Sequence, residues 1–197
     1  MRLGCSLRFI FKNRGALLVP VALALVVFGR PTIASATAGL ALAALGEIIR
    51  LWAVGYSGVT TRAEVVTAPA LVTAGPYAIV RNPLYVGNTV IALGFWLAFA
   101  GRTSLVTALL LLAFVLLLAI GVYAAIVPLE ESYLAQTFGA QFQSYRAKVP
   151  RAIPNGKTMP PLERTGTWRG EVIARAEIIT LAFFAAMTAA VILRLIY

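Results

Sequence analysis

The chain has 197 residues, of which 60% are hydrophobic and only 12% are charged. Soluble domains are about 25% charged, so this composition, with a mean hydropathy of +0.88, indicates a membrane protein. Because the chain has no His and a single Cys, Cys5, we exclude His-based metal sites, Ser-His-Asp triads, intrachain disulfides and cysteine-cluster metal sites, and we expect no bound metal.

Five apolar stretches predict an all-α, polytopic membrane protein with about five transmembrane helices. In chain order they are residues 16–28, 32–52, 82–101, 105–128 and 178–193. A helix needs about 20 apolar residues to cross the hydrocarbon core, so the third and fourth stretches fit best. The first and fifth are short and require snorkelling flanking residues or a locally thinner bilayer. We expect residues 1–197 to form one integral-membrane domain, with its last transmembrane helix at about 176–195.

The first stretch has a second interpretation, as a secretory signal peptide. A basic start and a short apolar run precede Ala34-Ser35-Ala36, which resembles a cleavage site. Arg30 and Pro31 interrupt the run before these small residues, so we favour a first helix that is retained.

The basic residues predict the orientation of the helices. Thirteen Lys or Arg lie before the first helix, between the second and third, or between the fourth and fifth, whereas Arg30, Arg102 and Arg194 lie on the opposite side. The positive-inside rule places the three basic segments, including the N-terminus, in the cytoplasm. We expect the inner (cytoplasmic) membrane of a prokaryote. The net charge of +10 then has a topological origin, and we expect no nucleic-acid partner.

The third and fourth helices should form a tight hairpin, because only Arg102, Thr103 and Ser104 separate Gly101 from the next apolar stretch. This arrangement would place the opposite ends of the two helices together on the cytoplasmic side.

A cytoplasmic, C-terminal amphipathic segment is predicted after the fourth helix. Its apolar residues recur at helical spacing and are Leu134, Phe138, Phe142 and Tyr145. We expect residues 129–148 to continue the fourth helix after a kink at Pro128. Four prolines between positions 150 and 161 predict that residues 149–170 are irregular.

Two polar clusters lie at the predicted cytoplasmic ends of the third and fourth helices. The first covers residues 71–88, and the second joins Glu130-Glu131 to residues 146–154. The hairpin should bring Asn82 to Tyr85 opposite Glu130, in a concave site at the membrane surface. Tyrosines can stack on a flat base, and a carboxylate can bind ribose hydroxyls or an ammonium group. These residue types suit a nucleoside ligand with a charged tail.

Both clusters resemble the signature of isoprenylcysteine carboxyl methyltransferases and their bacterial relatives. The first half of the resemblance consists of Leu71-Val72-Thr73, Gly75, Tyr77 and Arg81-Asn82-Pro83-Leu84-Tyr85-Val86-Gly87. The second half consists of Glu130-Glu131-x-x-Leu134, Phe138-Gly139, Tyr145 and Val149-Pro150-Arg151-x-Ile153-Pro154. The resemblance covers about residues 40–154. It implies that S-adenosylmethionine binds at the cytoplasmic face, leaves as S-adenosylhomocysteine, and meets a lipophilic substrate that enters from the bilayer.

Carried over position by position, the resemblance implies a set of cofactor-binding residues. They are Pro69, Ala70, Leu71, Val72, Tyr77, Asn82, Pro83, Leu84, Tyr85 and Glu130. Two positions depart from the family. Its usual His is Asn82, which cannot carry a proton near neutral pH, and an Arg that eukaryotic members use in substrate handling is Ile126.

The acceptor decides whether a catalytic base is needed. A carboxylate acceptor needs none, whereas an amine or hydroxyl acceptor would usually need its proton removed. The candidate catalytic residues for that step are Tyr85, Glu130 and Glu131.

Structural interpretations of the same residues stay open. Arg81-Asn82-Pro83 also fits a capped helix start, Tyr77 and Tyr85 fit interface aromatics, and Glu130-Glu131 fits a solvated pair. Elsewhere, Glu47 and Arg50 are spaced to pair along one helix face, and Arg62 and Arg151 suit either a cofactor or lipid phosphate.

Three classes of function remain on sequence alone. The first is an integral-membrane methyltransferase acting on a lipophilic acceptor, with the carboxylate of an isoprenoid or lipid-like molecule favoured over a phospholipid amine. The second is a nicotinamide-dependent membrane reductase of the sterol-reductase type, and the third is a non-catalytic membrane protein. The order of Tyr77, Asn82-Pro83 and Glu130-Glu131 favours the first, and the absence of any Gly-x-Gly gives no support to a Rossmann enzyme. The oligomeric state is left open.

Overall fold

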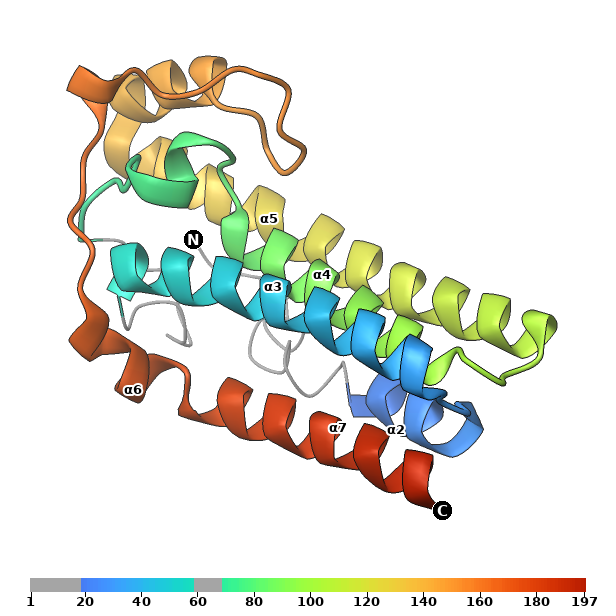
Figure 1. Cartoon of the computed structure of the whole chain (residues 1–197). Helices are drawn as coiled ribbons and strands as arrows, with labels where there is room; N and C mark the ends of the chain where they lie inside the picture. The colour runs from blue at the N-terminus through green and yellow to red at the C-terminus, as the bar shows by residue number, and fades with distance from the viewer. Residues whose placement is uncertain (1–18, 59–68) are drawn as a thin grey trace. The chain divides into compact units, whose positions relative to one another are not determined.

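The computed structural model describes residues 19–58 and 69–197, and the described part is all-helical (Figure 1), which confirms the predicted fold class. The elements are α2 (Val19–Phe28), α3 (Ile33–Ser57), η3 (Gly75–Ala78), α4 (Pro83–Phe99), α5 (Leu105–Lys148), η4 (Pro161–Glu163), η5 (Gly170–Val172), α6 (Ile173–Ala176) and α7 (Ile178–Ile196). The N-terminal basic residues, Cys5 and Arg62 lie outside the described residues.

Among the described helices, α3, α5 and α7 are long and apolar enough to cross a membrane, whereas α2 and α4 are apolar but shorter. Only 11% of the apolar stretch of α7 is buried inside the protein, so most of its apolar surface is available to lipid. Each predicted apolar stretch forms a helix over most of its described residues; Thr32, Asn82, Ala100 and Gly101 lie just outside the helices. The number of membrane crossings, and the side of the membrane on which each turn lies, stay predictions.

The chain forms two compact units. Unit 1 comprises Met1–Glu47, Asn88–Ile126 and Ile179–Tyr197, and unit 2 comprises Ile48–Gly87 and Val127–Ile178. Because α3, α4 and α5 each contribute residues to both units, the division runs across helices and not along loops. Each unit is described by itself below.

Unit 1 depends on close contact between α3 and α4. A Cβ at Gly94 would lie 2.4 Å from the backbone nitrogen of Ala43, and one at Gly39 would lie 2.2 Å from that of Ala98. Small residues therefore let the two backbones touch, as is common between helices in membranes. The buried core around this contact consists of Val21, Ala22, Leu25, Ala36, Ala43, Phe95, Ala98, Phe99, Leu111, Val115, Met187 and Val191.

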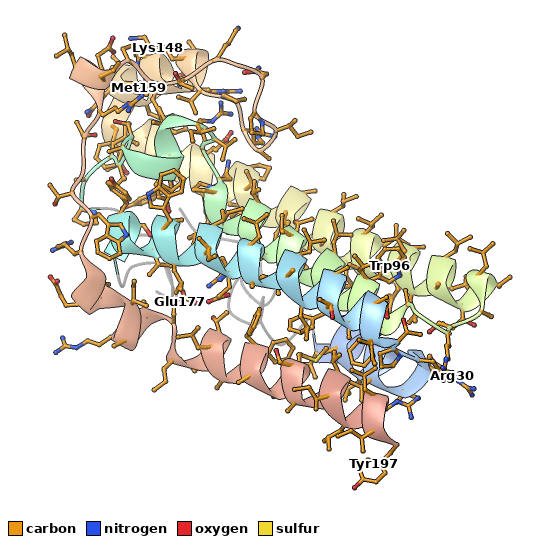
Figure 2. All side chains as sticks on the ribbon, viewed as in Figure 1. Arg30, Trp96, Lys148, Met159, Glu177 and Tyr197 are labelled. Carbon is orange, nitrogen blue, oxygen red and sulfur yellow. The ribbon has the colours of Figure 1, made fainter. Side chains whose placement is uncertain are left out.

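The turn between α4 and α5 is held by side-chain hydrogen bonds within unit 1. The indole nitrogen of Trp96, labelled in Figure 2, donates to the carbonyl of Ala108 over 2.8 Å. The hydroxyl of Thr103 donates to the carbonyl of Phe99, and that of Ser104 accepts from the backbone nitrogen of Thr107. These bonds join the end of α4 to the first turn of α5; the hairpin across the membrane stays a prediction.

Helix α5 continues through Pro128, where the sequence led us to expect a kink. The backbone instead leaves helical values at Gly139, with φ 50° and ψ −123°. A proline inside a helix keeps a helical φ, although it lacks an N–H donor and crowds the carbonyl four residues earlier, whereas a positive φ of this kind favours glycine. The residues after Lys148 are largely irregular up to α6, as the prolines predict, with short 3-10 turns at η4 and η5.

Candidate functional site

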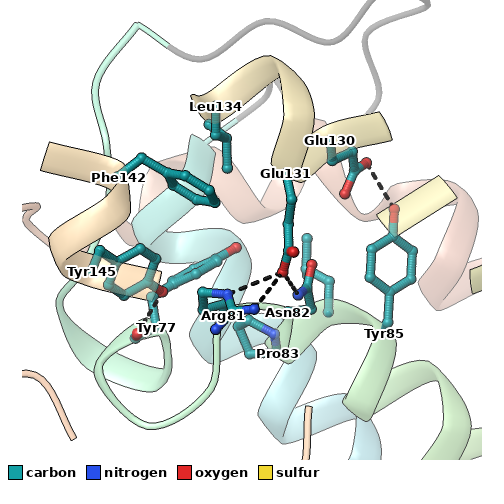
Figure 3. Close-up of a pocket in the computed structure, with 11 residues that line it drawn as sticks. Tyr77, Arg81, Asn82, Pro83, Tyr85, Glu130, Glu131, Leu134, Phe142 and Tyr145 are labelled. Carbon is teal, nitrogen blue, oxygen red and sulfur yellow. Dashed lines mark hydrogen bonds and ion pairs between the residues drawn. The ribbon is translucent and has the colours of Figure 1, made fainter. Parts of the chain in front are cut away.

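A cavity of about 120 Å³ lies in unit 2 (Figure 3). Its walls come from η3, the first turn of α4 and two stretches of α5 on either side of Gly139. The lining residues are Tyr77, Arg81, Asn82, Pro83, Leu84, Tyr85, Glu130, Glu131, Leu134, Phe142 and Tyr145. Residues more than 40 positions apart in the sequence thus meet at one site.

Tyr77 is presented by the short helix η3. The turn starts at Gly75, where φ is +60° and a Cβ would lie 2.2 Å from the ring of Tyr56, so only glycine fits. The hydroxyl of Tyr145 donates to the carbonyl of Tyr77 over 2.7 Å and fixes the turn against the end of α5. Burial raises the pKa of the Tyr77 hydroxyl to about 12, although a hydrogen bond with Ser57 lowers it in part. Tyr77 is therefore a neutral donor near neutral pH.

Glu131 forms the centre of a buried ion cluster. Its Oε1 atom lies 2.9 Å from Nη2 of Arg81, and its Oε2 atom lies 2.8 Å from Nη2 of Arg151. The side chains of Arg81 and Glu131 are each only 8% exposed. Arg81 also donates to the carbonyls of Arg146 and Val149 near the end of α5. The cluster therefore joins the segment before α4 to both parts of α5.

The charge state of Glu131 follows from these contacts. Glu131 lies beyond the apolar stretch that ends at Pro128. Burial raises the pKa of its carboxyl, but the hydrogen bonds and charges of Arg151 and Arg81 outweigh burial and hold the pKa below its usual value. The same contact raises the pKa of Arg151. A carboxylate held in this way is a poor proton acceptor, and the interpretation of Glu131 as a solvated residue does not fit its burial.

Asn82 is buried beside this cluster. Its amide nitrogen donates to the carbonyl of Arg151 over 3.1 Å and lies 3.4 Å from Oε1 of Glu131 (Figure 3). The backbone nitrogens of Arg81 and Asn82 donate to the carbonyls of Pro150 and Arg151. The residue in the position of the family's His thus serves here as a donor that fastens the start of α4 to residues 150–151.

Glu130 lies opposite the first turn of α4, where the sequence placed it. The hydroxyl of Tyr85 donates to Oε1 of Glu130 over 2.7 Å (Figure 3). Both side chains are half-buried and line the cavity. This contact provides a carboxylate and an aromatic ring next to each other in the same wall.

Four residues of the expected binding set do not line this cavity. Pro69 and Ala70 are exposed, and Val72 is half-buried. Leu71 is buried in a second core cluster with Ala78, Phe142, Tyr145, Val149 and Met159. The resemblance covers this stretch, but in the described structure Leu71 contributes to core packing and Pro69 and Ala70 face outwards.

Sequence reasoning assigned no ligand role to four other lining residues, Arg81, Leu134, Phe142 and Tyr145. Leu134, Phe142 and Tyr145 recur at helical spacing, which predicts a buried face but does not distinguish a core from a cavity wall. Arg81 belonged to the motif, but its carboxylate partner 50 residues away was not visible in the sequence.

A second buried ion pair lies outside the cavity in unit 2. Nη2 of Arg50 lies 2.5 Å from Oε2 of Glu177, whose side chain is 1% exposed. Glu177, labelled in Figure 2, follows the last residue of α6. From the spacing alone we expected Arg50 to pair with Glu47, three residues earlier on the same helix. The contact with Glu177 joins α3 to the junction between α6 and α7.

The chemistry of the cavity fits part of a nucleoside ligand that carries a cationic group. Tyr77, Tyr85, Phe142 and Tyr145 offer aromatic surface, and Glu130 offers a carboxylate. Sites for whole drug-sized ligands usually occupy about 300–1,000 Å³. The described residues therefore enclose one part of such a ligand and not all of it. Among the described residues, no group of three or more His, Cys, Asp or Glu side chains gathers to hold a metal ion.

Several known proteins resemble part of this chain. It is 34% identical over 136 residues to the cobalt-zinc-cadmium resistance protein of Cupriavidus metallidurans, covering 68% of this chain and 52% of that protein. It is 39% identical over 85 residues to the protein-S-isoprenylcysteine O-methyltransferase of Schizosaccharomyces pombe, covering 43% and 33% of the two chains. It is 32% identical over 123 residues to protein-S-isoprenylcysteine O-methyltransferase B of Arabidopsis thaliana, covering 59% and 57%. No solved structure matches the chain.

The chain spans 57% or less of the length of each of these relatives. A family model described as phospholipid methyltransferase matches residues 34–141, which is more than half of the chain and includes Tyr77, Tyr85 and Glu130. The expected resemblance to isoprenylcysteine methyltransferases is thereby confirmed, and the chain belongs to the phospholipid methyltransferase family of membrane methyltransferases.

Proposed function

We propose that this protein transfers a methyl group from S-adenosylmethionine to a lipophilic acceptor. The observation that carries the proposal is the contact between Tyr85 and Glu130 in a cavity wall, within the region that the methyltransferase family model matches. A carboxylate beside an aromatic ring suits a ligand that combines a flat base, hydroxyls and a cationic group.

The lining residues would divide the binding of the cofactor between them. When bound, S-adenosylmethionine supplies an electrophilic methyl group on a sulfonium sulfur. Glu130 offers its carboxylate to the ammonium group or the ribose hydroxyls, and Tyr77 and Tyr145 offer aromatic surface to the base. Pro83 begins α4 and leaves the first-turn donors of Leu84 and Tyr85 at a positive helix end, which suits the carboxylate tail.

The protonation states of the residues in the cavity favour an acceptor that is already deprotonated, because these residues are poor proton acceptors. Tyr77 keeps its proton near neutral pH, because its pKa is raised to about 12. Glu131 is bound to two arginines, and Asn82 cannot carry a proton. In-line displacement by a carboxylate needs only positioning by the protein. We therefore favour the carboxylate of an isoprenoid or another lipid-like molecule as the acceptor.

A phospholipid amine is the second candidate acceptor, and the description of the family model favours it. Glu130 and Tyr85 would then be the nearest groups to receive the proton. The family match favours methyl transfer over the reductase that hydropathy left open. The similarity to a metal-resistance protein does not lead us to propose metal binding, since the described residues offer no cluster of metal ligands.

We further propose that the reaction takes place at the cytoplasmic face of a prokaryotic inner membrane, with the N-terminus in the cytoplasm. The distribution of Lys and Arg supports this orientation. The acceptor would enter from the bilayer, so membrane lipids are the surroundings of the site and no nucleic acid takes part.

Ligand binding tests the proposal directly. Isothermal titration of detergent-purified protein with S-adenosylhomocysteine and with NADPH should show binding of the nucleoside thioether only. Binding of NADPH alone would reject methyl transfer in favour of a reductase. Binding of neither compound would favour a non-catalytic membrane protein.

A further inference from the structure

Residues 151–158 form a loop in unit 2 that is fixed at both ends to the wall of the cavity. At its start, the carbonyls of Pro150 and Arg151 accept from the backbone nitrogens of Arg81 and Asn82, over 2.9 and 3.1 Å. After its end, the backbone nitrogen of Met159 donates to the carbonyl of Ala78 over 2.9 Å. The base of the loop is therefore held by the segment that carries the cavity residues.

The loop itself presents an apolar residue to the surroundings. Ile153 is 81% exposed, and residues 153–158 are all exposed. Isolated exposed aliphatic residues are common on protein surfaces, so exposure alone shows little. Ile153 differs because backbone hydrogen bonds hold both ends of its loop, and because it lies between Arg151 and Lys157 in the sequence.

The sequence around Ile153 is basic, although Arg151 pairs with Glu131 and Lys148 with Glu163. Residues 146–162 contain Arg146, Lys148, Arg151 and Lys157 and no acidic residue. Arg146 and Lys157 are exposed, and half of the side chain of Arg151 is exposed although it contacts Glu131. An apolar tip with cations on both sides is the pattern by which protein segments bind the surface of anionic bilayers.

Another exposed aliphatic residue in the same unit provides a contrast. Leu162 is fully exposed, but it is followed by Glu163, whose carboxylate is paired with Lys148. Since Arg164 follows, the charge next to Leu162 is of mixed sign. The sequence on either side of Ile153, in contrast, has basic residues and no acidic one.

We propose that the loop 151–158 lies on the bilayer surface, with Ile153 inserted at the boundary between head groups and acyl chains. Arg146 and Lys157 then lie beside the phosphates of anionic lipids. Because the base of the loop is bound to Arg81 and Asn82, this contact brings the cavity wall next to lipid. The inference concerns a membrane contact and does not depend on methyl transfer.

A fluorescent probe at position 153 tests this contact. With Cys5→Ser as background, Ile153→Cys is labelled with the environment-sensitive dye NBD and reconstituted into bilayers of phosphatidylcholine, with or without phosphatidylglycerol. We expect spin-labelled lipids to quench the probe and aqueous iodide to quench it poorly. The effect should be larger in the phosphatidylglycerol bilayers. Lys157→Gln should lower the ratio of inserted to water-exposed probe about fivefold in the anionic bilayer.

The matched control is Ser144→Cys, which carries the probe at an exposed position of the last turns of α5 and should remain accessible to iodide. A probe at 153 that iodide quenches in every bilayer would overturn the proposal, as would shielding that appears only when a soluble protein fraction is added. Equal shielding of the probe in bilayers with and without phosphatidylglycerol would overturn the assignment of anionic lipid as the partner. S-adenosylhomocysteine binding by the labelled protein in detergent should be unchanged, so this proposal and the proposed function can fail separately.

Discussion

The two adjacent glutamates at the start of the amphipathic part of α5 have different surroundings. Glu130 shares a cavity wall with Tyr85, whereas Glu131 is enclosed by Arg81, Arg151 and Asn82. Neighbouring positions on a helix point about 100° apart, so adjacent side chains meet different partners. The structure therefore separates a carboxylate that contacts Tyr85 from one that is held by two arginines.

Substitution of Glu130 should affect cofactor binding and leave folding intact. We expect Glu130→Gln to weaken the affinity for S-adenosylhomocysteine by about 10- to 100-fold, because one charge-assisted hydrogen bond contributes about 1.5–3 kcal/mol. Titration calorimetry measures the affinity, and thermal unfolding checks the fold. Glu163→Gln is the control, since Glu163 pairs with Lys148 away from the cavity. Equal affinity in both variants and the parent would show that the site is misplaced.

Substitution of Glu131 should affect stability in a pH-dependent manner. Its pKa is held below the ordinary value of 4.5 in the folded state, so its stabilising contribution is present above that value and is lost as pH falls through the folded pKa. Removing one partner of a buried pair costs about 3–5 kcal/mol. We expect Glu131→Gln to unfold at a lower temperature than the parent at pH 7, and the difference to shrink below about pH 4.5. A difference that stays constant between pH 7 and pH 3 would contradict this assignment.

At the scale of elements, the two glycines of α5 have opposite roles. Gly121 and Gly139 both have open space where a Cβ would lie, but only Gly139 has a positive φ. The non-helical backbone at Gly139 precedes the turns that carry Phe142 and Tyr145 into the cavity wall. The orientation of these rings therefore depends on the backbone at a single residue.

Alanine at the two glycines should change stability in opposite directions. Gly139→Ala should destabilise by about 1–3 kcal/mol, because its conformation is strained for any other residue. Gly121→Ala should stabilise by about 1 kcal/mol, because alanine favours a helix. Thermal unfolding of both variants in the same detergent provides the comparison. A Gly139→Ala variant that is as stable as the parent, or more stable, would show that Gly139 does not require its conformation.

The same pair of glycines shows how far sequence reasoning reaches. The apolar stretches predicted the helices well, since residues 82–101 and 178–193 correspond to α4 (Pro83–Phe99) and α7 (Ile178–Ile196). The sequence could not locate the break in α5, because nothing in the neighbouring residues distinguishes a helical glycine from one with a positive φ. Proline is the stronger signal in a sequence, and it pointed to Pro128.

Side-chain partners were predicted where a motif ordered them and missed elsewhere. The contact between Tyr85 and Glu130 follows from two motif halves at neighbouring helix ends. The contact between Arg50 and Glu177 could not be predicted in this way, because the two residues are 127 positions apart and spacing within a helix indicates only local pairs. Long-range ion pairs depend on tertiary packing that periodicity does not contain.

At the scale of the whole molecule, the distribution of basic residues predicts on which side of the membrane each turn lies. In a Cys5→Ser background, Thr158→Cys should be protected from a membrane-impermeant maleimide in cells with an intact inner membrane, and Arg102→Cys should be labelled. Both positions are exposed in the structure. After the membrane is disrupted, both should react. Labelling of both positions before disruption would contradict the single crossing, by α5, that the proposed topology places between them.

The division into two units has a consequence for biogenesis. Each unit is assembled from segments far apart in the chain, and unit 2 includes residues up to Ile178. Arg50 and Glu177 are 127 residues apart in the chain, so their ion pair can form only after the ribosome has delivered residue 177. Unit 2 therefore cannot join α3 to the junction between α6 and α7 while the residues between them are still being made.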